Sequence, residues 1–301
     1  MATAAEWIEG ARLRTLPAAV APVLAGTGIA AFIQASDAVR ALLCLLVSLA
    51  LQVGVNYAND YSDGIRGTDA ERVGPLRLVG SGVAEPRSVK LAAFASFGVA
   101  AVAGLVLVLL TQQWWLLGLG VVAIASAWFY TGGKHPYGYL GLGEVFVFVF
   151  FGLMAVGGTI YAQALRVPVA GWVTAATIGL LACAILVANN LRDINGDRVA
   201  GKRTLAARLG DPATRTLLLG ILAASILGVV GVASLTTWWA LLGLLMVPLL
   251  IPVVRAVRAG ALGPQLIVVL KRIGQAELVC ALGLFVGLML GTPSIVYGVA
   301  R

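Results

Sequence analysis

Nine long apolar runs set the strongest constraint on how this chain can fold. They fall near residues 15–35, 40–59, 88–110, 114–131, 142–164, 169–190, 213–234, 237–257 and 274–298. A run of about 20 apolar residues is long enough to cross the hydrocarbon core of a bilayer as a helix. Since 60% of the 301 residues are hydrophobic and only 11% are charged, the composition excludes an ordinary soluble globule. We therefore predict an all-α polytopic membrane protein with nine transmembrane helices.

The helical form follows from the backbone, which must satisfy its own hydrogen bonds in lipid. The runs are rich in Leu, Ala and Gly and lack the alternation of barrel strands. The 37 glycines fit a helical bundle, because small residues let membrane helices approach closely. The chain begins with a polar stretch and its first apolar run is long, so we expect the first helix to stay as an anchor rather than to be cleaved.

The positive charges predict the orientation of the bundle. Arg40, Arg166 and Arg301 fall on one side, and the other 18 of the 21 Lys and Arg residues lie at the N-terminus or in loops after even-numbered spans. By the positive-inside rule, that larger set faces the cytoplasm and the C-terminus lies outside. Topology and contact with anionic lipid explain the net charge of +8, so no nucleic acid partner is expected.

The three cysteines, Cys44, Cys183 and Cys280, all fall within predicted spans. Their spacings are unrelated and no histidine lies near them, so neither a disulfide framework nor a zinc site is predicted. We expect them to be buried as small hydrophobic residues.

Two polar segments that end apolar runs carry the candidate chemistry. Asn59 and Asp63 are four residues apart in the first segment, and Asp193 and Asp197 are four apart in the second. Residues four apart share a helix face, so each pair projects together from a helix end. Carboxylates are costly to hold at the ends of membrane helices. Two such clusters therefore favour a shared ligand, a metal-bound polyanion.

The two segments also indicate a weak internal repeat, with halves of about 1–135 and 136–301 inside a single domain of 1–301. Long loops follow both segments, at about 64–87 and 191–212. We expect these loops to cap the cytoplasmic end of the bundle. The alternative is a chance similarity of two polar helix ends.

Hard carboxylate oxygens in this arrangement suit Mg²⁺, which prefers one or two carboxylates with waters and substrate phosphates. The competing interpretation is helix caps, or salt bridges of the acids to Arg66 and Arg192. Cations near the acids can offset the charge of a departing diphosphate, although each also fits the positive-inside pattern. They are Arg14, Arg66, Arg77, Lys134, Arg192, Lys202 and Arg203.

Three further residues lie at the same membrane face. Tyr130 and Lys134 share the short turn that ends the fourth span, and His135 follows without an assigned role. Glu144 begins the fifth span, where it either completes a helix N-terminus or faces the cavity near an aromatic substrate.

An ordered set of motifs runs along nearly the whole chain. They are residues 12–17 (RLRTLP), 59–64 (NDYSDG), 67–69 (GTD), 77–82 (RLVGSG), 130–134 (YTGGK), 141–144 (GLGE), 190–197 (NLRDINGD) and 201–205 (GKRTL). The set resembles the UbiA superfamily of intramembrane prenyltransferases, specifically its 1,4-dihydroxy-2-naphthoate polyprenyltransferase branch. Gly67 stands where that superfamily has a third acid in the first motif, so either Asp60 or Asp69 is expected to supply the missing ligand.

The resemblance implies a UbiA-like bundle in the bacterial cytoplasmic membrane, with a central cavity that opens sideways to lipid. It implies transfer of a polyprenyl group from polyprenyl diphosphate to 1,4-dihydroxy-2-naphthoate, with loss of carbon dioxide, giving demethylmenaquinone and diphosphate. Mg²⁺ is the implied cofactor, and no obligate protein partner is expected. Chain length and oligomeric state are left open.

The resemblance also implies roles for individual residues. The metal ligands would be Asn59, Asp60, Asp63, Asp193 and Asp197. The catalytic residues would be Asp63, Asp193, Asp197, Lys134 and Tyr130. The diphosphate would bind Arg66, Arg77, Lys134, Lys202 and Arg203, and the aromatic substrate would lie near Arg14 and Glu144. Either Arg14 or Lys134 would bind the naphthoate carboxylate.

Three alternative functions remain at this point. A related prenyltransferase would act on another aromatic acceptor. An ion-coupled transporter would place its acids near the middle of its spans, whereas these acids lie at helix ends. A phospholipid alcohol phosphotransferase would gather its acids in one compact signature, whereas this chain divides them between two segments.

Overall fold

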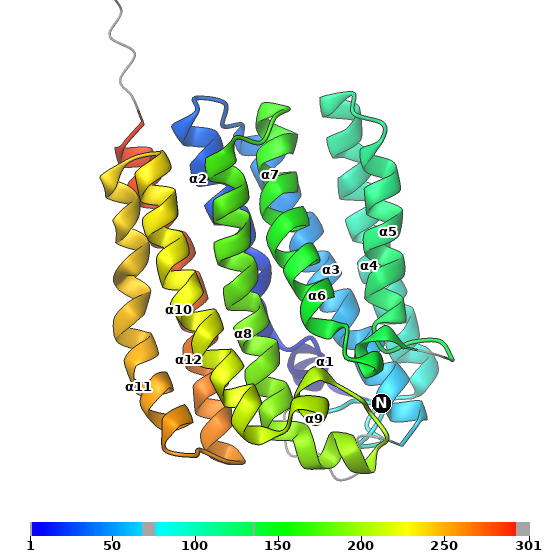
Figure 1. Ribbon diagram of the computed structural model, residues 1–301. Coiled ribbons are helices and arrows are strands. Elements are labelled where there is room, and N and C mark those ends of the chain that lie inside the picture. The colour runs from blue at the N-terminus through cyan, green and yellow to red at the C-terminus, as the bar shows by residue number, and fades with distance from the viewer. Residues whose placement is uncertain (1, 68–75, 135, 293–301) are drawn as a thin grey trace, which may run out of the picture.

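The computed structural model describes residues 2–67, 76–134 and 136–292. Within these ranges the chain forms helices and no strands (Figure 1). The helices are α1 (Ala4–Gly10), η1 (Leu13–Thr15), α2 (Pro17–Phe32), α3 (Ala38–Ile65), α4 (Pro86–Thr111), α5 (Leu116–Phe129), η2 (Tyr137–Leu140), α6 (Gly143–Val147), η3 (Phe148–Met154), α7 (Ala155–Ala164), α8 (Val169–Val199), α9 (Leu205–Leu209), α10 (Asp211–Leu235), η4 (Trp238–Met246), α11 (Val247–Arg258) and α12 (Pro264–Leu290).

The prediction of an all-helical membrane protein is confirmed, but the prediction of nine spans is not. Seven described helices are long and apolar enough to cross a membrane. An eighth span arises if the segment Ala4–Thr15 is joined to α2 across a bend of 48°. The run predicted at 114–131 forms only the 14 residues of α5, which reach about 21 Å against the roughly 30 Å hydrocarbon core.

Both aspartate segments lie inside long helices rather than beyond them. α3 continues through the first segment to Ile65, and α8 continues through the second to Val199. Each helix is followed closely by a glycine with positive φ, Gly67 at 70° and Gly201 at 71°. Glycine takes this left-handed conformation without the penalty that a side chain imposes. The glycine in place of the superfamily's third acid therefore serves to end α3.

The core of the bundle surrounds α8, which packs against α2, α10, α12 and η3. The element η3 is a seven-residue π-helical turn in the middle of the span Gly143–Ala164. A side chain at Gly152 of η3 would lie 2.7 Å from the backbone oxygen of Ala175 in α8, so the glycine allows the close approach of these two helices. π-Helical turns inside longer helices are frequent at functional sites.

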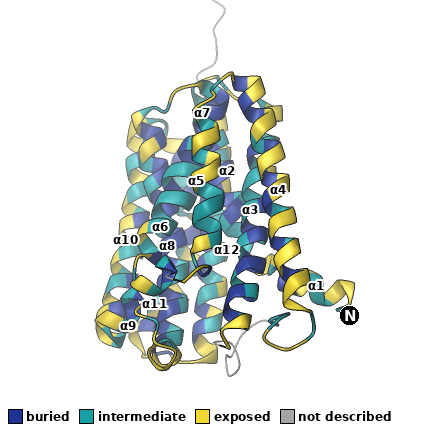
Figure 2. Cartoon of the chain, turned by 90° about the vertical axis from the view of Figure 1, so that its right-hand side faces the viewer, coloured by how far each residue is buried: buried dark blue, intermediate teal, exposed yellow. Residues whose placement is uncertain are grey.

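α3 and α4 form the other packed part of the bundle, with α1 lying beside them at one end (Figure 1). Exposed residues run along the outer face of α4 (Figure 2), and from Leu91 onward the large ones among them are apolar. Such a face suits hydrocarbon rather than water. Cys44, Cys183 and Cys280 are buried, which confirms the burial predicted for them.

Candidate active site

The Asp63 carboxylate lies at the centre of a polar cluster near the C-terminal end of α3. Its side chain is 4% exposed, and it lies 3.8 Å from an Nη2 atom of Arg77 and 3.7 Å from the Nζ atom of Lys202. The hydroxyl of Tyr139 donates a hydrogen bond to the same carboxylate. Arg77 comes from the loop after the first aspartate segment and Lys202 from the loop after the second. The loops of both halves therefore meet at one acid, at what we call the aspartate end of the bundle.

Tyr139 gathers the cations of this cluster around its ring. The Nζ atom of Lys202 lies 4.6 Å from the ring centroid and the guanidinium carbon of Arg66 lies 5.6 Å from it. These are distances of cation–π attraction. The Tyr139 carbonyl also accepts a hydrogen bond of 2.9 Å from the backbone N–H of Arg203. Tyr139 could not be predicted from the sequence, because its partners are distant along the chain and it belongs to none of the recognised motifs.

The second aspartate segment is held by its own neighbours. Arg192 donates to both oxygens of Asp193, at 2.6 and 2.7 Å. The hydroxyl of Thr204 donates to the Asp197 carboxylate at 3.2 Å, and the Lys202 backbone N–H donates to the Asp197 carbonyl at 2.8 Å. The salt bridge considered for Arg192 is thus formed. Through Lys202, the turn after Asp197 extends to Asp63.

The donor set at the aspartate end fits Mg²⁺ by its chemistry. Asp63, Asp193 and Asp197 offer hard carboxylate oxygens, which Mg²⁺ prefers. Within the described ranges, no group of three or more His, Cys, Asp and Glu side chains forms a ready metal cage. An ion bound at this end would therefore need further ligands from outside the chain, and Mg²⁺ takes water and substrate phosphates as such ligands.

Asp60 and Asn59 tie the neighbouring loops to α3. Asp60 is fully buried, and its two oxygens accept hydrogen bonds from the backbone N–H groups of Leu78 at 2.7 Å and Val79 at 3.0 Å. The Oδ1 atom of Asn59 accepts a 2.7 Å hydrogen bond from the Thr131 hydroxyl. Asp60 therefore anchors the loop that carries Arg77. The other acid considered for the missing ligand, Asp69, lies outside the described residues, as does His135.

The other predicted site residues divide into two groups. Arg66 donates to the backbone carbonyls of Thr131 and Gly133, so it holds the turn that contains Lys134. The side chains of Lys134, Arg14 and Arg203 are exposed, and the structure brings none of these three to the Asp63 carboxylate as it does Arg77 and Lys202.

Tyr130 and Glu144 lie on different sides of α6 and η3. Tyr130 lines the large cavity described below, with its ring centroid 5.5 Å from that of Tyr137. Burial raises the pKa of Tyr137, with a smaller contribution from Tyr130, so Tyr137 stays a neutral phenol. Glu144 instead accepts a 3.0 Å hydrogen bond from Asn190 and lines a separate, smaller pocket.

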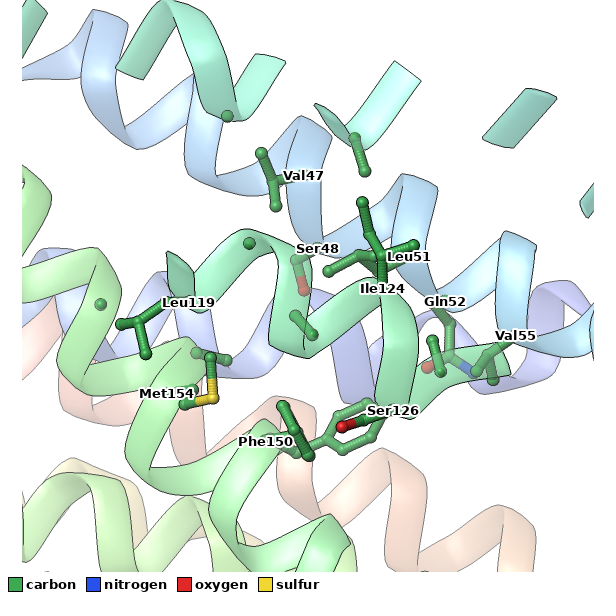
Figure 3. A pocket seen from close by; sticks show the side chains of 18 of the residues that line it. Val47, Ser48, Leu51, Gln52, Val55, Leu119, Ile124, Ser126, Phe150 and Met154 are labelled. Carbon is green, nitrogen blue, oxygen red and sulfur yellow. The ribbon is translucent and has the colours of Figure 1, made fainter. Parts of the chain in front are cut away.

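A cavity of about 680 Å³ extends from the aspartate end along α3, between α4 and α5 on one side and η3 and α7 on the other (Figure 3). Its walls are mainly apolar, but α3 contributes a polar row to them. The row comprises Ser48, Gln52, Asn56 and Asn59. Asn59 lies one helical turn before Asp63, so this end of the cavity lies next to the polar cluster, although Asp63, Arg77 and Lys202 do not line it.

A hydrogen-bond network fixes this polar row. The Gln52 amide nitrogen donates to the Thr15 hydroxyl at 3.0 Å, and the Asn56 amide nitrogen donates to the same hydroxyl at 2.9 Å. Asn56 also donates to the Ala11 carbonyl at 2.9 Å. The segment before α2 is thereby fastened to α3. Gln52 and Asn56 were not predicted as site residues, because amides inside an apolar run show no pattern that predicts a site.

Comparisons with known proteins identify the family of this chain. The model of the UbiA prenyltransferase family matches residues 19–262. A 1,4-dihydroxy-2-naphthoate octaprenyltransferase of Mycobacterium tuberculosis is 55% identical over 98% of this chain and 100% of the relative. A protein of the same name from Escherichia coli is 39% identical over 93% of this chain and 94% of the relative. These matches confirm the resemblance found from the motifs.

Solved structures share the fold. A UbiA homolog from Archaeoglobus fulgidus bound to GPP and Mg²⁺ matches 94% of this chain and 99% of its own, with a TM-score of 0.66 and 14% sequence identity. A UbiA homolog from Aeropyrum pernix K1 matches 91% of this chain and 97% of its own, with a TM-score of 0.65 and 18% identity. At these identities the likeness concerns the arrangement of the helices.

Proposed function

Since the chain belongs to the UbiA prenyltransferase family, we propose that it transfers a polyprenyl group from polyprenyl diphosphate to 1,4-dihydroxy-2-naphthoate. The observation that carries this proposal is the meeting of Arg77 and Lys202 at Asp63, beside the mouth of a long apolar cavity. A prenyl diphosphate has the matching shape, with a charged head and an apolar tail. The head binds at the aspartate end and the tail lies in the cavity.

The cavity opens sideways to lipid in this proposal. Leu105, Leu117 and Val121 line the cavity, and they are also 44%, 41% and 68% exposed. They lie on α4 and α5, whose apolar outer surfaces suit hydrocarbon. A long donor therefore enters from the bilayer without passing through water. The aspartate end faces the cytoplasm, in agreement with the distribution of Lys and Arg residues.

Asp63, Asp193 and Asp197 would hold Mg²⁺ together with the donor's diphosphate. When bound there, Mg²⁺ withdraws charge from the diphosphate as a leaving group. Asp60 is left out of this set, because both of its oxygens already accept backbone hydrogen bonds. Before the donor binds, Arg77 and Lys202 neutralise Asp63. They then turn to the diphosphate oxygens.

The reaction moves electron pairs in a simple order. The allylic carbon–oxygen bond breaks and its electron pair leaves on the diphosphate, where Arg77 and Lys202 stabilise the new charge. The apolar cavity keeps water from the allylic cation. The electron-rich naphthoate ring attacks that cation, and its carboxylate leaves as carbon dioxide with the bonding pair returned to the ring. The product is demethylmenaquinone in its quinol form, so no oxidant is needed.

The acceptor binds near the same end of the cavity, where Tyr130 and Asn59 line the wall. Either Arg14 or Lys134 pairs with the naphthoate carboxylate, since both are exposed cations in the loops of this end. Glu144 is directed to Asn190 and not to the large cavity, which favours a role in joining α6 to α8 over contact with the acceptor.

The decisive test is prenyl transfer by the purified, full-length protein in detergent. We expect labelled farnesyl diphosphate, 1,4-dihydroxy-2-naphthoate and Mg²⁺ to give a prenylated, decarboxylated product. Replacing the acceptor by 4-hydroxybenzoate should give little product. A preference for 4-hydroxybenzoate would show that the protein belongs to another branch of the family. Solute uptake by proteoliposomes without any prenyl transfer would support the transporter instead.

A further inference from the structure

Three glycines line the cavity where a side chain would enter empty space. They are Gly104 of α4, Gly120 of α5 and Gly158 of α7. A Cβ atom built at any of the three has no other atom within 4 Å beyond its local backbone. Ordinary helix-packing glycines behave differently. A Cβ at Gly287 of α12, for example, would lie 2.1 Å from the Trp239 carbonyl oxygen.

The three glycines share a depth as well as a cavity. Gly104 lies in the last third of α4, which runs away from the aspartate end. Gly120 lies in the second turn of α5, which runs back toward that end, and Gly158 lies in the first turn of α7, which ends the span Gly143–Ala164. All three therefore border the half of the cavity farther from Asp63, on three separate helices.

We propose that Gly104, Gly120 and Gly158 determine the length of prenyl chain that this protein accepts. This inference rests on the proposed function and adds the residues that control donor specificity. A short donor fills only the half of the cavity near Asp63. A long donor must continue past the three glycines, and the missing side chains leave the space for it. Helix packing does not require glycine at these positions, so the empty volume is the feature that they supply.

The chain offers matched controls on the same helices. Gly98 of α4 and Gly118 of α5 also have nothing within 4 Å of a built Cβ atom and are exposed, as Gly120 is, but neither of them lines the cavity. Leucine at these positions adds the same bulk to the outer surface. The pairs Gly104 with Gly98, and Gly120 with Gly118, thus separate filling the cavity from adding leucine to a membrane helix.

The experiment measures kcat/KM of full-length variants with geranyl diphosphate and with a donor of eight isoprene units, using 1,4-dihydroxy-2-naphthoate as acceptor. For Gly104→Leu, Gly120→Leu and Gly158→Leu we expect the ratio of long to short donor to fall by about tenfold or more, the scale of steric discrimination in an apolar pocket. Activity with geranyl diphosphate should stay within about threefold of wild type, and it reports that each variant is folded. Gly98→Leu and Gly118→Leu should keep the wild-type ratio.

Two results would overturn the inference. One is an unchanged ratio in all three cavity variants. The other is loss of the short donor's reaction together with that of the long donor, because the glycines would then serve the fold rather than the chain length. Failure of the proposed function is distinguishable from both, since the wild-type protein would then transfer neither donor.

Discussion

The Nζ atom of Lys202 lies 3.7 Å from the Oδ1 atom of Asp63, and both side chains are nearly buried, at 12% and 4% exposure. This contact joins the turn after the second aspartate helix to the first aspartate helix. Asp63 and Arg77 belong to the first half of the chain, whereas Lys202 belongs to the second. The site is therefore assembled only when the two halves fold against each other.

Removal of the Lys202 ammonium should impair chemistry more than folding. For Lys202→Ala we expect kcat to fall by about 10²- to 10³-fold, the loss that follows removal of one preorganised group that stabilises developing charge. The measurement is steady-state prenyl transfer at saturating Mg²⁺. Lys271→Ala provides the control, because that lysine is exposed on α12. Equal activity of both variants would show that Lys202 does not take part in binding the diphosphate.

Replacing Tyr139 by phenylalanine separates the two contacts that its side chain makes. The phenylalanine ring keeps the cation–π contacts with Lys202 and Arg66, but the hydrogen bond to Asp63 is lost. We expect kcat/KM to fall by about tenfold, the equivalent of one hydrogen bond to a charged group. Tyr139→Leu removes both contacts, so its kcat/KM should fall further. Wild-type rates in both variants would show that Tyr139 has no part in arranging the site.

The sequence predicted which acids share a helix face and named Arg77 and Lys202 as nearby cations, but it did not predict which side chains contact each acid. The spacing of Asp193 and Asp197 is a local helical property, so it could be read directly from the chain. The contacts of Asp63 with Tyr139, Arg77 and Lys202 depend on loops that meet only in the folded bundle. Asp60 shows the same limit, because a carboxylate that accepts backbone hydrogen bonds cannot be told from a metal ligand by its position in a motif.

Asp60 and Asp63, three residues apart in one helix, should respond in opposite ways to substitution. Asp60→Asn loses an acceptor for the N–H groups of Leu78 and Val79, so we expect the free energy of unfolding to fall by about 1–3 kcal/mol. Asp63→Asn should lose transfer while it unfolds close to the wild-type temperature. Thermal unfolding and transfer measured on both variants decide the matter. If the Asp60→Asn protein were inactive but fully stable, Asp60 would have to be counted among the metal ligands.

Chelation of Mg²⁺ should abolish transfer without unfolding the protein. Asp63 is paired with Arg77 and Lys202, and Asp193 with Arg192, so both acids have positively charged partners when no metal is bound. We expect EDTA to remove activity, excess Mg²⁺ to restore it, and the unfolding temperature to change little in either direction. A large drop in unfolding temperature with EDTA would instead indicate a structural metal.

Glu277 should be dispensable for transfer. It lies at the middle of α12, is fully buried, and neither carboxyl oxygen has a hydrogen-bond partner among the described residues. Burying a polar group without a partner costs about 1–3 kcal/mol, so Glu277→Leu should stabilise the protein by an amount of that order. Thermal unfolding and prenyl transfer test both statements. A transporter, by contrast, uses acids placed in mid-span. If Glu277→Leu lost activity while remaining folded, Glu277 would have a function. The transporter hypothesis, which the position of the other acids at helix ends argues against, would then have to be reconsidered.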